Sequence, residues 1–276
     1  MPNGDPSATV KTVSTIEAPL GTLLRDWRQR RRMSQLDLAL EAGVSARHLS
    51  FLETGRSRPS RDMVLRLCEE LSVPLRDRNG LLLAAGFAPA YQERPLEAPE
   101  MEPVRRAVAQ VLTGHEPFPA AVVDRWWNLV AANRNVSLFL EGVAPHLLAP
   151  PANVLRVSLH PEGMAPRIAN LAEWRGHLLD RLRREVAATA DARLAELLEE
   201  VEAYPRPDEA APPRPPQGAI AVPLVLRHGD RELIFFSTVA TFGTAVDVTV
   251  AELSIEAFFP ADSATAGFLH ELLPER

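Results

Sequence analysis

A glycine turn between two short helical patterns constrains the fold of this chain more than any other feature. Apolar residues recur at helical spacing up to residue 42, and Gly43 follows, where a helix C-cap needs a left-handed backbone that glycine adopts readily. Ser45 is then placed as the N-cap of a second helix over residues 46–53. Two short helices joined in this way predict a helix-turn-helix. The apolar positions of the two helices are Leu36, Leu38, Ala39, Ala42, Leu49 and Leu52.

The outer face of the second helix is short and polar, which suits the major groove of DNA. Arg47 and His48 are placed to reach base edges or phosphates, and arginine on guanine is the commonest specific contact. Gln35 sits in the first turn of the preceding helix, where a side-chain amide and free N–H groups can both hold a phosphate. Arg56 and Arg58, in the following loop, are best placed to neutralise the DNA backbone. The candidate DNA-binding residues are Gln35, Ser45, Arg47, His48, Ser50, Arg56 and Arg58.

The distribution of charge supports this interpretation. The whole chain has a net charge of −6, which by itself argues against a nucleic-acid partner. Residues 20–61, however, hold nine arginines and four acidic residues, giving +5, so the remainder carries −11. A basic head on an acidic body is typical of a DNA-binding module joined to another domain. Glu53 would repel phosphates, and we interpret it as an internal partner of Arg25 or Arg28.

A longer set of motifs extends this pattern over several helices. It consists of residues 34–39, 43–45, 49–50, 52–56 and 58–60. Their spacing of glutamine, glycine, glutamate and proline resembles the helix-turn-helix of the XRE (Cro/C1-repressor-like) transcription factors. The resemblance implies an all-α, lambda-repressor-like DNA-binding domain of five helices, which we place at residues 17–88; a generic small helical bundle is the alternative. We expect the helices at residues 20–32, 34–42, 46–53, 60–71 and 74–86.

Prolines divide the rest of the chain. Residues 89–102 predict a semi-stiff linker, and residues 103–276 a second domain. Residues 1–16 lack periodicity and predict a loose arm, and the proline-rich residues 205–218 predict an exposed loop. Every apolar run is shorter than the roughly 18 residues that a membrane helix needs, and the N-terminus lacks a signal-peptide core. We therefore expect a cytoplasmic protein without a membrane partner.

The second domain mixes helical and strand patterns, which predicts an α+β fold with an antiparallel sheet and helices on one side. Residues 120–133 indicate a β-hairpin, and residues 220–238 a second hairpin. Alternation predicts a strand over residues 247–255, whereas residues 153–160 fit a helix or a strand equally. Helices are predicted over residues 103–112, 135–141, 168–188, 192–204 and 263–273.

Catalytic chemistry is poorly supported. The seven histidines show no metal-binding spacing, and the chain has no phosphate loop, nucleophile elbow or Cys/His couple. Cys68, the one cysteine, occupies an apolar position of a helix, and we interpret it as a structural thiol rather than a redox sensor. We therefore expect no enzyme, no metal site and no cofactor.

Two features of the second domain could belong to a ligand site. Its aromatic residues fit either an apolar pocket or an ordinary core. Its polar set of Arg156, His160 and Asn170 could converge on a pocket and hold a carboxylate. Local caps and surface ion pairs are the alternative for each of these three side chains.

Four segments of this domain form a second resemblance: VDRWWNLVAAN at residues 123–133, NVLRVSLHP at 153–161, FSTVATFG at 236–243 and FFPAD at 258–262. They resemble the MmyB-like regulators. The resemblance implies a PAS-like ligand-sensing and dimerisation domain whose apolar tunnel takes a fatty acid or similar amphiphile. It also implies ligand-binding residues: Arg156 and His160 as a polar mouth, with Trp127, Phe139, Phe235 and Phe242 as the lining.

Together these features predict a sequence-specific DNA-binding transcription regulator whose second domain senses a small apolar, fatty-acid-like ligand. One short recognition helix contacts few bases, so we expect a homodimer on an inverted-repeat operator in double-stranded DNA. Two alternatives remain. The second domain could be only a dimerisation scaffold without ligand, or the chain could be an enzyme fused to a repressor head.

Overall fold

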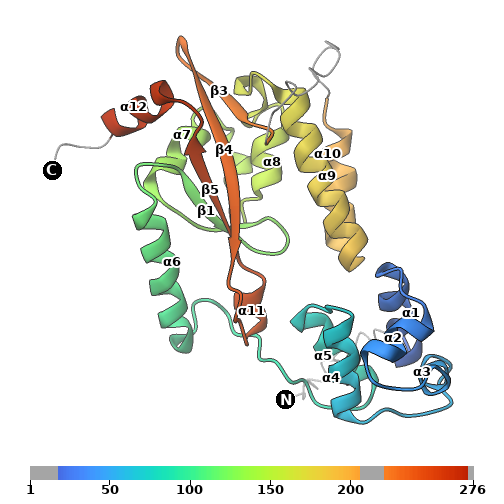
Figure 1. Cartoon of the computed structure of the whole chain (residues 1–276). Helices are drawn as coiled ribbons and strands as arrows, with labels where there is room; N and C mark the ends of the chain where they lie inside the picture. Colours follow the sequence, from blue (N-terminus) through green and yellow to red (C-terminus); the bar gives the residue numbers. More distant parts are fainter. Residues whose placement is uncertain (1–17, 206–220, 273–276) are drawn as a thin grey trace, which may run out of the picture. The chain divides into compact units, whose positions relative to one another are not determined.

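A computed structural model describes residues 18–205 and 221–272 of the chain (Figure 1). The chain divides into two compact units, with the boundary between Ala90 and Tyr91. The expected proline-rich loop falls almost wholly on residues 206–220, outside the described residues, as does the expected N-terminal arm. None of the helices in the described ranges combines the length and the apolar character that crossing a lipid bilayer requires.

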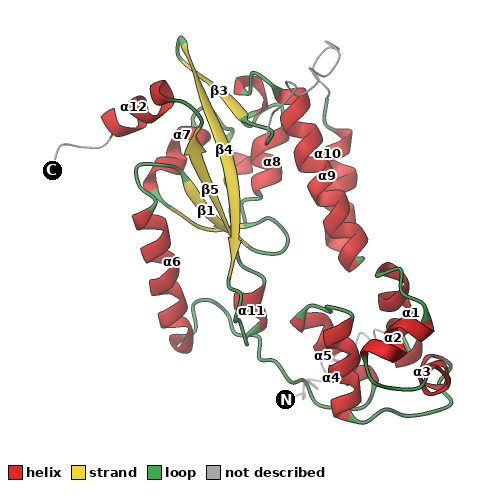
Figure 2. Cartoon of the chain, viewed as in Figure 1, coloured by secondary structure: helices red, strands yellow, loops and turns green. Residues whose placement is uncertain are grey.

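The first unit consists of the five predicted helices (Figure 2). Serine caps begin three of them: Ser34, Ser45 and Ser60 each accept a hydrogen bond from a backbone N–H of the first turn. Ser34 forms a full capping box, because the side chain of Asp37 accepts the Ser34 N–H in return. The helices are α1 Leu20–Arg30, α2 Gln35–Glu41, α3 Ala46–Glu53, α4 Arg61–Glu70 and α5 Leu75–Ala84.

One apolar core holds these five helices together. Leu49 and Leu52 of α3 are buried in it, as predicted, whereas Leu36 is 59% exposed on α2. Cys68 lies in the same core, and burial raises the pKa of its thiol to about 12. A thiol with so high a pKa forms little of the reactive thiolate, in agreement with a structural role. The largest buried side chains of the core are Trp27, Leu38, Leu49, Leu52, Leu67, Leu71, Leu81 and Leu82.

The second unit is built on a five-stranded antiparallel sheet with the order β2-β1-β5-β4-β3. Both predicted hairpins are present as β1–β2 and β3–β4. The last strand enters between them, so strands that are distant in sequence become neighbours. The strands are β1 Ala120–Val123, β2 Leu129–Ala132, β3 Leu224–His228, β4 Arg231–Thr241 and β5 Ser254–Pro260.

Helices cover both faces of the sheet, not one side as predicted. The main core lies against α7 to α10, while α6 packs on the opposite face (Figure 1). α6 is amphipathic, and its Val108 and Leu112 form a separate apolar cluster with Val122 and Ile255. The helices are α6 Glu102–Gly114, α7 Ser137–Leu140, α8 Val154–Leu159, α9 Leu171–Thr189, α10 Ala192–Ala203, α11 Val248–Ala251 and α12 Ser263–Glu271. Single 3-10 turns occur at Pro99–Met101, Arg134–Val136, Pro145–Leu147 and Ala165–Arg167.

Side-chain caps explain where the strand predictions differ from the structure. The strand predicted at residues 247–255 is wrong: Asp247 caps the short helix α11 by accepting the N–H of Thr249, and β5 begins only at Ser254. The ambiguous residues 153–160 form α8, because the Asn153 side chain accepts the first N–H groups of that helix.

Candidate functional site

The turn between α2 and α3 has the geometry that its sequence predicts. Gly43 has φ +64°, and the N–H of Val44 donates to the carbonyl of Ala39 over 2.8 Å, which closes the end of α2. Ser45 then caps α3 by accepting the N–H of His48 over 3.1 Å. The turn therefore fixes α3 against the core and leaves its other face outward.

The outward face of α3 carries the predicted DNA-binding side chains. Arg47 is exposed, and its guanidinium lies 5.3 Å from the ring centroid of Phe51. His48 and Ser50 are half-buried, and Ser45 is exposed at the start of the helix. Arg56 and Arg58 are exposed in the loop that follows. These side chains come from one helix and its flanks, as the predicted major-groove contact requires.

Glu53 is the centre of a buried polar network behind that face. Arg28 donates to both carboxylate oxygens, over 2.6 and 2.9 Å, and Arg25 lies 3.6 Å away, so the predicted internal ion pair is present. Burial alone would raise the pKa of Glu53, but the hydrogen bonds from Arg28 and Gln35 and the charges of both arginines hold that pKa below its usual value. Gln35 reaches Glu53 through Nε2 over 2.8 Å, so its side chain is positioned by this network.

The second unit contains an apolar cavity of about 100 Å³ between the sheet and α7, α8 and α9. Ala121 and Val123 of β1 and Phe258 of β5 form its floor, and Trp127 and Trp174 stand in its wall. An apolar, aromatic-lined space with few polar groups is typical of a small-molecule site.

Charged groups lie at one place in this cavity. Arg181 of α9 and Glu256 of β5 both line it, with Nη1 and Oε1 2.6 Å apart. Arg181 also contacts Glu185 over 3.2 Å, and Glu185 accepts the indole N–H of Trp127 over 2.8 Å. Burial raises the pKa of Glu185 and of Glu256, and the nearby Arg181 offsets only part of that rise. Trp127 itself has φ +65°, a left-handed backbone that is costly for a bulky residue.

Two of the four predicted lining residues line the cavity, and the other two lie elsewhere. Trp127 and Phe139 line the cavity. Phe235 lies behind Phe139, with ring centroids 5.4 Å apart, and is fully buried. Phe242 packs with the α6 cluster on the other face of the sheet.

The predicted polar mouth lies at a different and more open cavity. Arg156 binds Glu200 there over 2.7 Å, and His160 packs edge-on against Tyr204. Asn170 instead bridges to β3, donating to Pro223 and accepting the N–H of Val225. The alternative of an ion pair therefore describes Arg156, whereas the Asn170 side chain caps no helix N–H and ties the start of α9 to β3 instead.

Sequence reasoning missed Arg181 and Glu256. The signal in the sequence is that Glu256 lies two positions before Phe258, so both side chains point to the same face of the strand. This signal gave no prediction, because the predicted strand covers residues 247–255 and ends one residue before Glu256.

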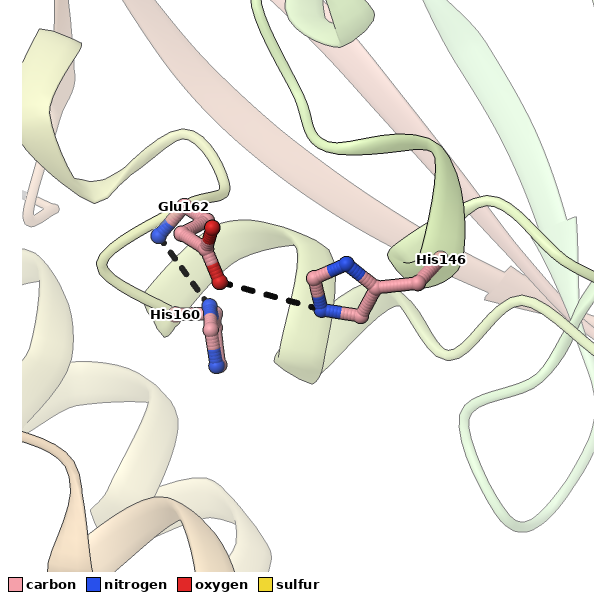
Figure 3. Close-up of side chains that lie close together, drawn as sticks. All are labelled: His146, His160 and Glu162. Atoms are coloured by element: carbon pink, nitrogen blue, oxygen red, sulfur yellow. Dashed lines mark hydrogen bonds and ion pairs between the residues drawn. The ribbon is translucent and has the colours of Figure 1, made fainter.

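A third cluster brings together His146, His160 and Glu162, whose candidate ligand atoms all lie within 4.8 Å of one another (Figure 3). His160 Nδ1 accepts the backbone N–H of Glu162 over 3.0 Å, which leaves the proton of a neutral imidazole on Nε2. A cation bound to Nε2 would move the imidazole proton to Nδ1, and Nδ1 could then no longer accept the Glu162 N–H. The side chains of His146 and Glu162 are also 59% and 66% exposed. The arrangement favours a hydrogen-bonded turn over a metal centre.

Comparison with known proteins agrees with this two-part organisation. Residues 24–77 match a helix-turn-helix family model. The uncharacterized HTH-type transcriptional regulator RghRB of Bacillus subtilis is 30% identical over 115 residues, covering 41% of this chain and 81% of that protein. The solved structure of the clp gene regulator ClgR from Corynebacterium glutamicum is 26% identical, with a TM-score of 0.22, and covers 36% of this chain and 90% of its own.

The second unit has its own family match. Residues 104–272, more than half of the chain, match the model of the MmyB-like transcription regulator ligand binding domain. Both resemblances seen in the sequence are thereby confirmed, and the alternative of an enzyme fused to a repressor head is not supported, because these relatives are transcription regulators. The chain belongs to the MmyB-like transcription regulators and joins a helix-turn-helix DNA-binding domain to a ligand-binding domain.

Proposed function

We propose that this regulator acts in the cytoplasm as a homodimer on an inverted-repeat operator, and that a small apolar, fatty-acid-like molecule in its PAS-like domain controls operator binding. The observation that carries the proposal is the apolar cavity lined by Trp127, Phe139 and Phe258. Its lining is apolar except for a few side chains, so it favours an apolar body with a single polar end.

The proposed homodimer on an inverted repeat rests on the small number of side chains that α3 can offer to DNA bases. The polar side chains that α3 presents from its outward face are Arg47, His48 and Ser50. One helix of this kind reads few base pairs, and two copies related by a two-fold axis double the contacts without a new motif.

Ligand control requires a ligand that prefers one arrangement of the paired DNA-binding units. The cavity of about 100 Å³ is below the roughly 300–1,000 Å³ of a typical ligand pocket, so a long chain requires the lining to open. Trp127, with its strained backbone, and its partner Glu185 are the residues that we propose to move. A movement of this wall on ligand entry would give the bound and free states different shapes.

Mass spectrometry of the purified full chain, native and then denatured, tests the proposal first. We expect a dimer that carries a small amphiphile, which leaves on unfolding, and operator affinity that changes when the amphiphile is removed. A clean ligand-free dimer from several expression hosts, with operator affinity unchanged by added amphiphiles, would instead support the scaffold alternative.

A further inference from the structure

Arg181 and Glu256 form what we call the polar corner of the cavity. Two of their hydrogen-bonding atoms are not used by other residues. Arg181 uses Nη1 for Glu256 and Nε for Glu185, and Glu256 uses only Oε1. Within the described residues, Arg181 Nη2 and Glu256 Oε2 are left without a hydrogen-bond partner. Glu256 is only 8% exposed and lines the cavity, so a molecule inside the cavity is well placed to reach these atoms.

The two spare atoms are of opposite kind. The N–H of Arg181 Nη2 needs an acceptor, and Glu256 Oε2 needs a donor. Neither atom is among the fully buried atoms that lack a partner, so both can be reached from the cavity, and a ligand that serves both atoms is preferred over one that serves neither.

The net charge of the polar corner determines which polar head groups of a ligand can bind there. One guanidinium faces two carboxylates, those of Glu185 and Glu256, at 3.2 and 2.6 Å. The charge of Arg184 on the same helix also acts on Glu185, so the two carboxylates are already matched by two arginines. An ionised carboxylate on the ligand would add a further negative charge in a largely apolar space, where like charges repel strongly.

We propose that the ligand of this sensor carries a neutral polar head that both donates and accepts a hydrogen bond, as a primary amide or an alcohol does, and that Glu256 excludes an ionised carboxylate. The head donates to Glu256 Oε2 and accepts from Arg181 Nη2, and the tail lies among Trp127, Phe139 and Phe258. This inference rests on the proposed function, because it assumes a small apolar ligand in the cavity. It narrows the fatty-acid-like class to its neutral derivatives.

A series of probes with one eight-carbon tail tests the head directly: octanamide, octan-1-ol, octanoate and octylamine. Binding to the full-length protein at pH 8 is followed by NMR of the four tryptophan indole N–H groups, because Trp127 and Trp174 line the cavity. We expect octanamide and octan-1-ol to bind at least about tenfold more tightly than octanoate and octylamine. Their binding should shift the Trp127 resonance, since its N–H bonds to Glu185 beside the head.

The variant Glu256→Gln removes one negative charge from the polar corner and nearly preserves the shape of the side chain. We expect it to narrow the preference for octanamide over octanoate by about tenfold, whereas Glu199→Gln, at an exposed site on α10, leaves the preference unchanged. Equal binding of octanoate and octanamide to the wild-type protein, or tightest binding of octylamine, would overturn the inference while leaving the proposed sensor intact. If no probe of the series binds, the proposed sensor fails together with the inference. The wild-type series decides the question even if the variant does not fold.

Discussion

Arg28 donates two hydrogen bonds to Glu53, from Nε to Oε1 over 2.6 Å and from Nη2 to Oε2 over 2.9 Å, and so ties α1 to the end of α3. The two residues are 25 positions apart, and the Glu53 side chain has no exposed surface. A buried pair of this kind contributes modestly by itself, but removal of one partner leaves the other charge buried and uncompensated.

The variant Glu53→Gln should therefore lower the free energy of unfolding of the first unit by about 3–5 kcal/mol. Urea unfolding followed by hydrogen exchange of the α1 and α3 amides measures this change. The exposed Glu41→Gln on α2 serves as the control and should stay within about 0.5 kcal/mol of the wild type. Equal stability of the two variants would show that the network is not needed for the fold.

Gly21 gives a second test of how α1 meets α3. A Cβ at this position would collide with the backbone carbonyl of Glu53, so the two helices approach as closely as they do only because residue 21 is glycine. Gly21→Ala should destabilise the first unit by about 1–3 kcal/mol, measured by thermal unfolding.

Gly80 provides the matched comparison for Gly21. It lies inside α5 with open space around its ideal Cβ position. Gly80→Ala should stabilise the same unit by about 0.5–1 kcal/mol, because alanine is the better helix residue. A destabilised Gly80→Ala, or an unaffected Gly21→Ala, would contradict this account of the two positions.

The helix-turn-helix could be predicted from sequence because its signals are local. Gly43, Ser45 and the capping serines act within one helical turn, and each shows its role in its own neighbourhood. Even the partnership of Glu53 could be inferred, since an acidic residue in a basic region needs a cation nearby.

The cavity could not be predicted in the same way, because its polar corner joins α9 to β5 across 75 positions of sequence. Arg181 and Glu256 appear as ordinary charged residues until the strand order places β5 next to β1 and β4. Arg156 and His160 looked more suitable, since they are polar among apolar neighbours, but they lie at another cavity. Which polar residues meet is a property of topology rather than of spacing.

DNA reading by Arg47 can be separated from simple phosphate contact. Arg47→Ala should weaken operator binding by about 1–3 kcal/mol and relax the preference for one base pair. Arg58→Ala, in the loop after α3, should weaken binding to every sequence alike and reduce the salt dependence by about one counterion. Binding to operator and to unrelated DNA, measured over a range of salt concentrations, compares the two. If Arg47→Ala weakens binding to every DNA sequence equally, Arg47 contacts the phosphate backbone of the DNA instead of a base.

The carboxyl groups of Glu53 and Glu256 should respond to pH in opposite directions. The pKa of Glu53 is lowered in the folded state, so its stabilising contribution is present at neutral pH and is lost as pH falls through that lowered value. The pKa of Glu256 is raised by burial, so folding takes up a proton there, and the associated stability is complete below the usual glutamate pKa and is lost as pH rises through the raised value.

Glu256→Gln, which resembles the protonated side chain, should therefore unfold at a higher temperature than the wild-type protein at pH 8. The difference should disappear near pH 4, where the wild-type carboxyl is itself protonated. Glu199→Gln, on the exposed surface of α10, should show no such crossover. A Glu256→Gln protein that is less stable at pH 8 would mean that the pair with Arg181 outweighs the burial of the charge. The cavity would then hold its negative corner as a stabilising element of the fold rather than as a strained site kept for a ligand.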